Sequence, residues 1–171
     1  TPPLLLTEIM FHPGNPPAGD VTDSEQFEFV ELKNVSERTL NLTGFRISGG
    51  IEYTFTAASA VTSLAPGARV LVVKNRAAFT ARYPGVTGIA GEFTGQLANN
   101  ENTVRITGPL EEVISETRYQ DSWAPLADGF GFSLVLRDEA TPFEQLGDET
   151  KWRLSANVGG SPGAADPEPP M

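Results

Sequence analysis

The chain has 171 residues, 39% of them hydrophobic, which suffices for one large domain with a sizeable core. Its formal net charge of −10 disfavours nucleic acid and anionic membranes as partners, because both bind proteins through Lys and Arg. The sequence has no Cys and a single His, which excludes a disulfide framework, a thiolate nucleophile, a zinc-thiolate site and a multi-histidine metal site.

Strand signals follow one another along the chain, separated by turns rich in Gly, Pro and Asn. They predict nine short strands, at residues 4–11, 27–33, 40–47, 52–55, 69–74, 93–97, 103–107, 112–119 and 132–137. The apolar centre of 69–74 indicates a strand buried on both faces. Asn75 as an N-cap predicts one short helix at 76–82. This pattern favours an all-β sandwich or barrel over an alternating α/β fold.

The ends of the chain differ from its middle. Residues 1–3 are predicted to be an N-terminal tail, 4–158 the single domain, and 159–171 a linker or disordered tail rich in Pro and Gly. No apolar run approaches the ~20 residues that span a bilayer, so we expect no membrane insertion. Because the chain opens with Thr-Pro-Pro, we interpret it as a piece of a longer protein from which a targeting segment has been removed.

Seven short motifs follow one another along nearly the whole chain. They are LTEIMFHP (6–13), EFVELKN (28–34), LNLTGF (40–45), LAPG with VLVV (64–73), GQLAN with VRI (95–106), DGFGFSL (128–134) and SPG (161–163). In this order they resemble the lamin tail domain family, particularly its bacterial, often secreted, members. Phe45 stands where that family usually has Trp, and an insert from 14 to 26 lengthens the first loop.

The resemblance implies an immunoglobulin-like β-sandwich, here of about nine short strands with one short helix. The family has no accepted catalytic residues, so we expect that the chain is not an enzyme. In bacteria such domains are typically appended to secreted or surface proteins as adhesive or targeting modules. We therefore expect an extracellular or cell-surface location within a multidomain chain.

Four carboxylates are candidate Ca²⁺ ligands. Glu8 and Glu31 lie in two strands that the resemblance makes neighbours, and a partly buried pair must be protonated, matched by Arg or bridged by a cation. Asp20 and Asp23 lie in the acidic loop between these strands, and oxygen-rich loops suit Ca²⁺. The favoured alternative is that the pair bonds backbone and Arg groups while the loop acids are solvated.

Three further features have both a structural and a chemical interpretation, and in each case we favour the structural one. His12 is either a turn residue or the one ordinary general base of the chain. The segment 128–132 is either a close approach of two glycines into a strand or a phosphate or metal loop. Four aromatic residues are either core side chains or a sugar-binding platform: Tyr53, Tyr119, Trp123 and Trp152.

The sequence thus predicts a non-catalytic interaction or adhesion module of a larger secreted or cell-surface bacterial protein. Loops at one end of the sandwich or an exposed sheet edge would hold an unidentified protein or carbohydrate polymer. One alternative is an accessory domain of an extracellular hydrolase that binds its substrate or Ca²⁺. Another is a stand-alone hydrolase with Glu8 and Glu31 as its acid pair, which needs a cleft around both. No cofactor is expected beyond the candidate Ca²⁺.

Overall fold

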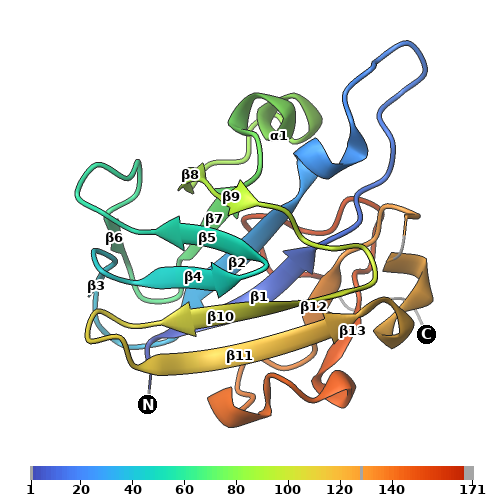
Figure 1. Ribbon diagram of the computed structural model, residues 1–171. Helices are drawn as coiled ribbons and strands as arrows, with labels where there is room; N and C mark the ends of the chain where they lie inside the picture. Colours follow the sequence, from blue (N-terminus) through green and yellow to red (C-terminus); the bar gives the residue numbers. More distant parts are fainter. Residues whose placement is uncertain (1, 128, 168–171) are drawn as a thin grey trace.

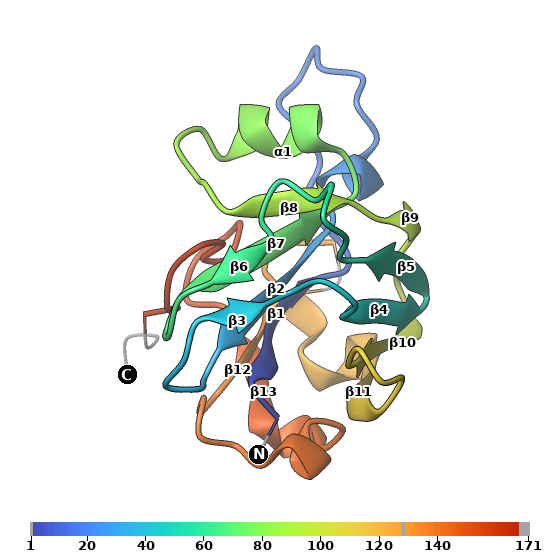
Figure 2. The same cartoon turned by 90° about the vertical axis from the view of Figure 1, so that its left-hand side faces the viewer.

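Two β-sheets pack face to face in the computed structural model, which describes residues 2–127 and 129–167 (Figure 1). One sheet has the strand order β13-β12-β1-β2-β7-β8, the other has the order β11-β10-β4-β5-β9, and β3 pairs with β6 beside them. Figure 2 shows the two large sheets as separate layers. The all-β, immunoglobulin-like sandwich predicted from the sequence is therefore confirmed.

The strands are short, and one α-helix and five 3₁₀ turns connect them in the described residues. Their bounds are β1 (Leu4–Met10), η1 (Ser24–Phe27), β2 (Phe29–Asn34), β3 (Leu40–Asn41), β4 (Arg46–Gly49), β5 (Ile51–Thr54), β6 (Ser63–Leu64), β7 (Arg69–Val73), α1 (Arg76–Arg82), β8 (Ile89–Glu92), β9 (Thr94–Gly95), β10 (Glu101–Thr107), β11 (Val113–Gln120), η2 (Asp121–Trp123), η3 (Pro125–Ala127), β12 (Leu134–Leu136), η4 (Phe143–Gln145), η5 (Glu149–Lys151) and β13 (Trp152–Leu154).

Some predicted strands differ from those observed. The predicted strand 40–47 is divided into β3 and β4, because Gly44, with φ +95°, turns the chain between them. Within the predicted strand 93–97 the structure has only the two-residue β9, and the unpredicted β8 lies just before it in the other sheet. The two-residue β6 and three-residue β13 were not predicted, because runs of that length carry no recognisable alternation.

The predicted helix is confirmed as α1, with the same bounds. The Asn75 side chain accepts a hydrogen bond of 3.1 Å from the backbone N–H of Ala78, which caps the first turn. The helix connects β7 to β8, and these strands pair in parallel, which requires such a crossover. Its buried residue, Phe79, packs on the outer face of the six-stranded sheet.

Each central strand of the six-stranded sheet is buried on both faces. Alternate residues such as Val30, Val70 and Val72 point into the core between the sheets. The side chains on the outer face form a second apolar cluster beneath α1, made of Met10, Phe29, Leu71, Val73, Phe79 and Ile89. The predicted burial of 69–74 on both faces is thus confirmed, since Val70 to Val73 are all 0% exposed.

The rest of this outer face is covered by the C-terminal segment. Residues 159–167, called the strap below, were expected to belong to a linker or disordered tail, yet they lie against β1 and β2. The expected tail therefore begins no earlier than residue 168, and residues 168–171 lie outside the described part of the chain. None of the helices in the described residues is long and apolar enough to cross a bilayer.

Candidate functional site

Glu8 and Glu31 form a buried carboxylate pair on the outer face of the six-stranded sheet. They are directly opposite each other across the antiparallel β1–β2 pairing. Because side chains alternate along a strand, Glu8 points to the same side as Met10, and Glu31 to the same side as Phe29. Each glutamate is only 1% exposed, so both carboxyl groups are almost completely shielded from solvent.

Glu8 lacks a cationic partner among the described residues. Its Oε2 atom accepts hydrogen bonds from Ser133 Oγ at 2.6 Å and from the Ser161 backbone N–H at 3.0 Å. Its Oε1 atom has only a long contact of 3.4 Å, with Ser161 Oγ. Burial, together with the neighbouring charge of Glu31, raises the pKa of Glu8 to about 8. Glu8 therefore carries a proton at neutral pH.

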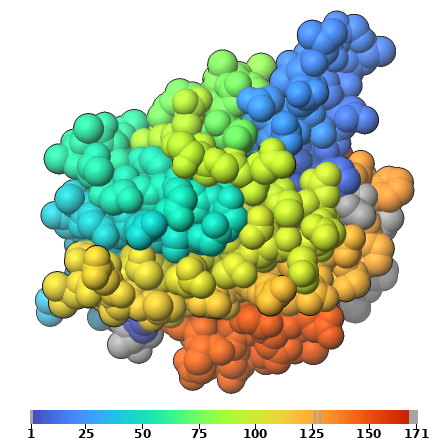
Figure 3. Space-filling view, in the orientation of Figure 1, coloured from blue at the N-terminus to red at the C-terminus, as the bar shows by residue number. Residues whose placement is uncertain are grey.

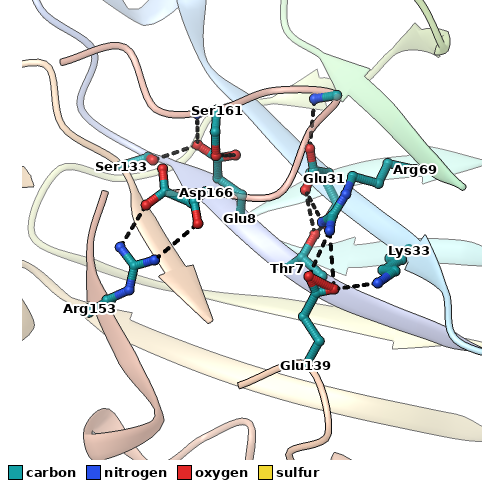
Figure 4. A network of polar contacts seen from close by, with 11 residues as sticks. Thr7, Glu8, Glu31, Lys33, Arg69, Ser133, Glu139, Arg153, Ser161 and Asp166 are labelled. Carbon is teal, nitrogen blue, oxygen red and sulfur yellow. Dashed lines mark hydrogen bonds and ion pairs between the residues drawn. The ribbon is translucent and has the colours of Figure 1, made fainter. Parts of the chain in front are cut away.

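Glu31 has the opposite environment, because a guanidinium group lies beside it (Figure 4). Its Oε1 atom accepts from Thr7 Oγ1 at 2.8 Å and pairs with Arg69 Nη1 at 3.0 Å, while Oε2 accepts from the Gly163 N–H at 2.8 Å. Burial raises the pKa of Glu31, but these hydrogen bonds and the charge of Arg69 oppose that rise. Of the two glutamates, Glu31 is the one that keeps its charge.

The ion-pair network extends from Glu31 to the surface. Arg69 also pairs with Glu139 at 2.6 Å, and Lys33 pairs with the same carboxylate at 2.7 Å. Burial works against ionisation of Glu139, but the hydrogen bonds from Lys33 and Arg69 outweigh it and lower its pKa. The network therefore joins β2 and β7 to the segment that follows β12.

A third buried carboxylate comes from the strap. Asp166 Oδ2 pairs with Arg153 Nη1 at 2.6 Å and accepts from the Ala156 N–H at 2.9 Å, and its side chain is 5% exposed. Sequence reasoning missed this residue because it lies in the segment expected to be a tail. The available signal is the motif SPG at 161–163, the last of the seven ordered motifs, which ends three residues before Asp166.

The four candidate calcium ligands do not come together. Asp20 and Asp23 lie on the long loop after β1, which projects from the body of the molecule (Figure 3), whereas the carboxylate pair lies beneath the strap. Asp20 Oδ1 instead accepts two hydrogen bonds from Thr22, which lower the pKa of Asp20. Within the described residues, no group of three His, Asp or Glu side chains is arranged to hold a metal ion.

The other sequence candidates also have defined places. Tyr119 and Trp152 are 0% and 2% exposed and belong to the core, so the four aromatic residues form no common platform. His12 lines a polar cavity of about 390 Å³ with Asp23, Glu25 and Asn99. In the segment 128–132, residue 128 lies outside the described residues, and Gly129 and Gly131 both have positive φ, as a close turn requires.

The free edge of the five-stranded sheet is a second candidate surface. β11 pairs with β10 on one side only, and the hydrogen bond from Asp121 N–H to Asn100 O fixes which residues face β10. By alternation, the backbone N–H and C=O groups of Arg118 and Gln120 point away from β10. They have no hydrogen-bond partner among the described residues. This backbone can therefore pair with another extended chain.

A groove runs along this edge, where β11 borders the turns around η4 and η5. We call it the edge groove; its volume is about 500 Å³ and it is lined by Arg118, Gln120, Trp123, Gly147, Asp148 and Glu149. Thr117 Oγ1 donates to Leu146 O at 3.0 Å and so ties the far wall to the strand. The groove thus combines free backbone groups, one indole and two carboxylates.

Comparison with known proteins gives a family and a fold. The family model described as Lamin Tail Domain matches residues 1–138. A crystal structure of a DUF4876 family protein from Bacteroides thetaiotaomicron is similar, with a TM-score of 0.56 and 11% sequence identity over 93% of this chain and 69% of that chain. At that identity the likeness shows the fold alone. No curated protein sequence matches the chain.

Proposed function

The chain belongs to the lamin tail domain family, a family of non-enzymatic immunoglobulin-like domains, and from this premise we propose that it is a non-catalytic interaction module. The module would serve a larger secreted or cell-surface protein. Its partner would be a protein segment that binds in extended conformation in the edge groove. The observation that carries the proposal is the unpaired backbone of Arg118 and Gln120 beside that groove.

The carboxylate pair supports the non-catalytic part of the proposal. A hydrolase needs its acid and its base in contact with substrate. Glu8 and Glu31 are each 1% exposed, and three of their four oxygen atoms accept hydrogen bonds of 3.0 Å or shorter from the protein. Their role is to hold the strap and the sheet together. A cavity of about 380 Å³ borders both glutamates, but each is 1% exposed at its floor and is bonded to the protein, which argues against their use on a substrate.

The edge groove supports the choice of partner. Addition of a strand to a free sheet edge supplies backbone hydrogen bonds, and side-chain pockets add selectivity. Asp148 and Glu149 line the outer wall, while Arg118 is already paired with Glu101 at 3.1 Å. Together with the net charge of −10, this favours a segment that carries Lys or Arg. Trp123 offers an apolar surface for the stems of such side chains.

Titration of the domain with short synthetic peptides tests the proposal. We expect an octapeptide of alternating Thr and Lys to shift the amide NMR signals of Arg118 and Gln120 and to change Trp123 fluorescence, whereas a Thr-Glu octapeptide does not. Glu149→Lys should weaken binding at least tenfold. Glu37→Lys, the same charge change in an exposed turn, is the matched control and should bind like the unmodified domain.

Three results would overturn the proposal. The first is no shift at millimolar peptide. The second is a shift confined to the loop after β1 or to the strap. The third is binding of a soluble oligosaccharide such as chitohexaose in the edge groove in preference to the peptide, which would make the partner a carbohydrate polymer.

A further inference from the structure

We propose that the strap is a pH-sensitive latch, in which a proton on Glu8 holds residues 159–167 closed over the sheet and loss of that proton releases them. The latch lies on the six-stranded sheet and the edge groove on the other, so the two proposals stand independently.

The strap is held by groups that belong to the carboxylate pair and its neighbours. Ser161 and Gly163, two residues apart, donate their backbone N–H groups to Glu8 and Glu31 at 3.0 and 2.8 Å. Asp166 then pairs with Arg153. Gly160 lies directly on the Glu8 carboxyl, where a Cβ atom would collide with Oε2 and with Ser133 Oγ. The strap is therefore in close contact with the sheet at residues 160, 161 and 163 and is tied again at 166.

The ion pairs around the strap match three carboxylates with three cations, and none of them includes Glu8. Glu31 and Glu139 pair with Lys33 and Arg69 in the part of the network beneath the strap. Asp166 takes the remaining cation, Arg153. Three anions thus balance three cations. A negative charge on Glu8 would be buried without an ion-pair partner among the described residues, which is strongly unfavourable.

The hydrogen bonds show where the proton resides. Both short bonds to Glu8 are accepted by Oε2, so Oε1 is left to carry the proton. Asp166 Oδ1 is buried and has no hydrogen-bond partner, although Oδ2 of the same carboxylate has two. Figure 4 shows Asp166 between Glu8 and Arg153. The negative charge of Asp166 adds to that of Glu31 in favouring a protonated Glu8.

Loss of this proton turns the same contact into a repulsion. An ionised Glu8 would face Glu31 from β2 and Asp166 from the strap, both negative. The remaining titratable neighbour is Tyr83, at the end of α1, whose hydroxyl donates to Gly159 O at 2.8 Å and is neutral over this range. Glu31 cannot move because it lies in a central strand. The strap is the part that can leave.

The sign of the pH dependence follows from proton binding. The closed strap keeps Glu8 protonated up to about pH 8, whereas an open strap exposes Glu8 to water and returns its pKa toward the ordinary value. Opening therefore releases a proton, and its equilibrium constant rises by up to about tenfold per pH unit between those two values. Above about pH 8 both forms are ionised and the constant levels off.

Limited proteolysis of the whole chain tests the latch. Cleavage by proteinase K within residues 159–167 is followed by mass spectrometry from pH 6 to 9.5 and divided by the cleavage rate of a free peptide of the same sequence. We expect the ratio to rise at least tenfold between pH 6 and 8 and then level off. Tryptophan fluorescence, recorded in parallel, should stay native, which separates strap release from global unfolding.

Two variants make the result decisive. Glu8→Gln keeps an acceptor for Ser133 and Ser161 and carries no charge at any pH, so it imitates the protonated form and should abolish the rise. Glu37→Gln, at an exposed acid, should leave the rise unchanged. If Glu8→Gln fails to fold, Asp166→Asn removes the weaker of the two repulsions and should lower the pH at which the rise levels off, even though it weakens the pair with Arg153. A ratio independent of pH, or an unchanged rise in the variant that folds, would overturn the proposal.

Discussion

Replacement of Arg69 by alanine should be among the most damaging single changes at the site. The Arg69 side chain is 10% exposed and bonds Glu31, whose side chain is 2% exposed, and Glu139. Removal leaves Glu31 as a buried carboxylate without a cation, which typically costs about 3–5 kcal/mol. Domains of this kind have a free energy of unfolding of roughly 5–15 kcal/mol, so the variant would lose a large share of its stability.

Urea unfolding followed by tryptophan fluorescence measures this loss. With an m-value of about 2 kcal/mol/M, a loss of about 4 kcal/mol shifts the midpoint down by about 2 M at pH 7. The shift should shrink at pH 5, because Glu31 takes up a proton once its partner is gone and a neutral carboxyl is less costly to bury. Arg69→Lys keeps the positive charge but loses the planar guanidinium, so its urea midpoint should lie between those of the unmodified domain and Arg69→Ala.

Arg46→Ala is the matched control. Arg46 pairs with Glu52 at 2.7 Å, a distance as short as those around Arg69, but the two side chains are 52% and 48% exposed. An exposed pair contributes roughly 0–1 kcal/mol, so this variant should unfold almost like the unmodified domain. If Arg69→Ala and Arg46→Ala shifted the midpoint equally, the claim that burial makes the Glu31 ion pair indispensable would be refuted.

Three other predictions concern stability. Burial raises the pKa values of Glu8 and Glu28 to about 8, so the native state binds more protons than the unfolded chain. The free energy of unfolding should therefore fall as the pH rises from the ordinary pKa of Glu to about 8, by up to about 1.4 kcal/mol per pH unit for each group. Glu28→Gln should reduce this slope in urea titrations. Gly49→Ala should cost more than about 2 kcal/mol in the same assay, because φ is +109° and a Cβ would collide with Thr103 O; a near-neutral effect would contradict that geometry. Tyr119→Phe removes a 2.6 Å hydrogen bond to a backbone carbonyl and should lower stability by about 1–2 kcal/mol, measurable as a lower melting temperature; no change would mean that water replaces the hydroxyl.

The sequence predicted those parts of the fold that depend on local pattern. The helix at 76–82 was correct because Asn75 caps it and Pro84 follows it, and both signals act within a few residues. The strands around 4–11 and 69–74 agree with the prediction because short apolar runs bounded by turn residues favour buried strands. The ordered motifs then separated a sandwich from a barrel, which periodicity alone does not.

At the carboxylate site, the sequence identified the two glutamates, but their charge states depend on the neighbours that the fold gives them. Glu8 and Glu31 stand out in the sequence because the family resemblance places their strands side by side, and a partly buried carboxylate pair needs a proton, an Arg or a cation. Nothing in the local sequence says that Arg69 lies beside one glutamate and not the other, since that follows from the pairing of β2 with β7. The difference in charge state between the two glutamates is therefore a property of the tertiary structure.

The sequence by itself determined that this protein is an acidic, all-β domain of one family, because composition, turn residues and ordered motifs can be recognised without knowing which residues contact one another. Only the tertiary structure decided that residues 159–167 belong to the domain. A segment of Gly, Pro, Ser and Ala has no core-forming pattern, and it becomes ordered through contacts with residues more than a hundred positions away, such as Glu8 and Glu31. Long-range contacts of that kind also fix which carboxylate carries a proton and which strand edge stays free, and both proposals depend on them.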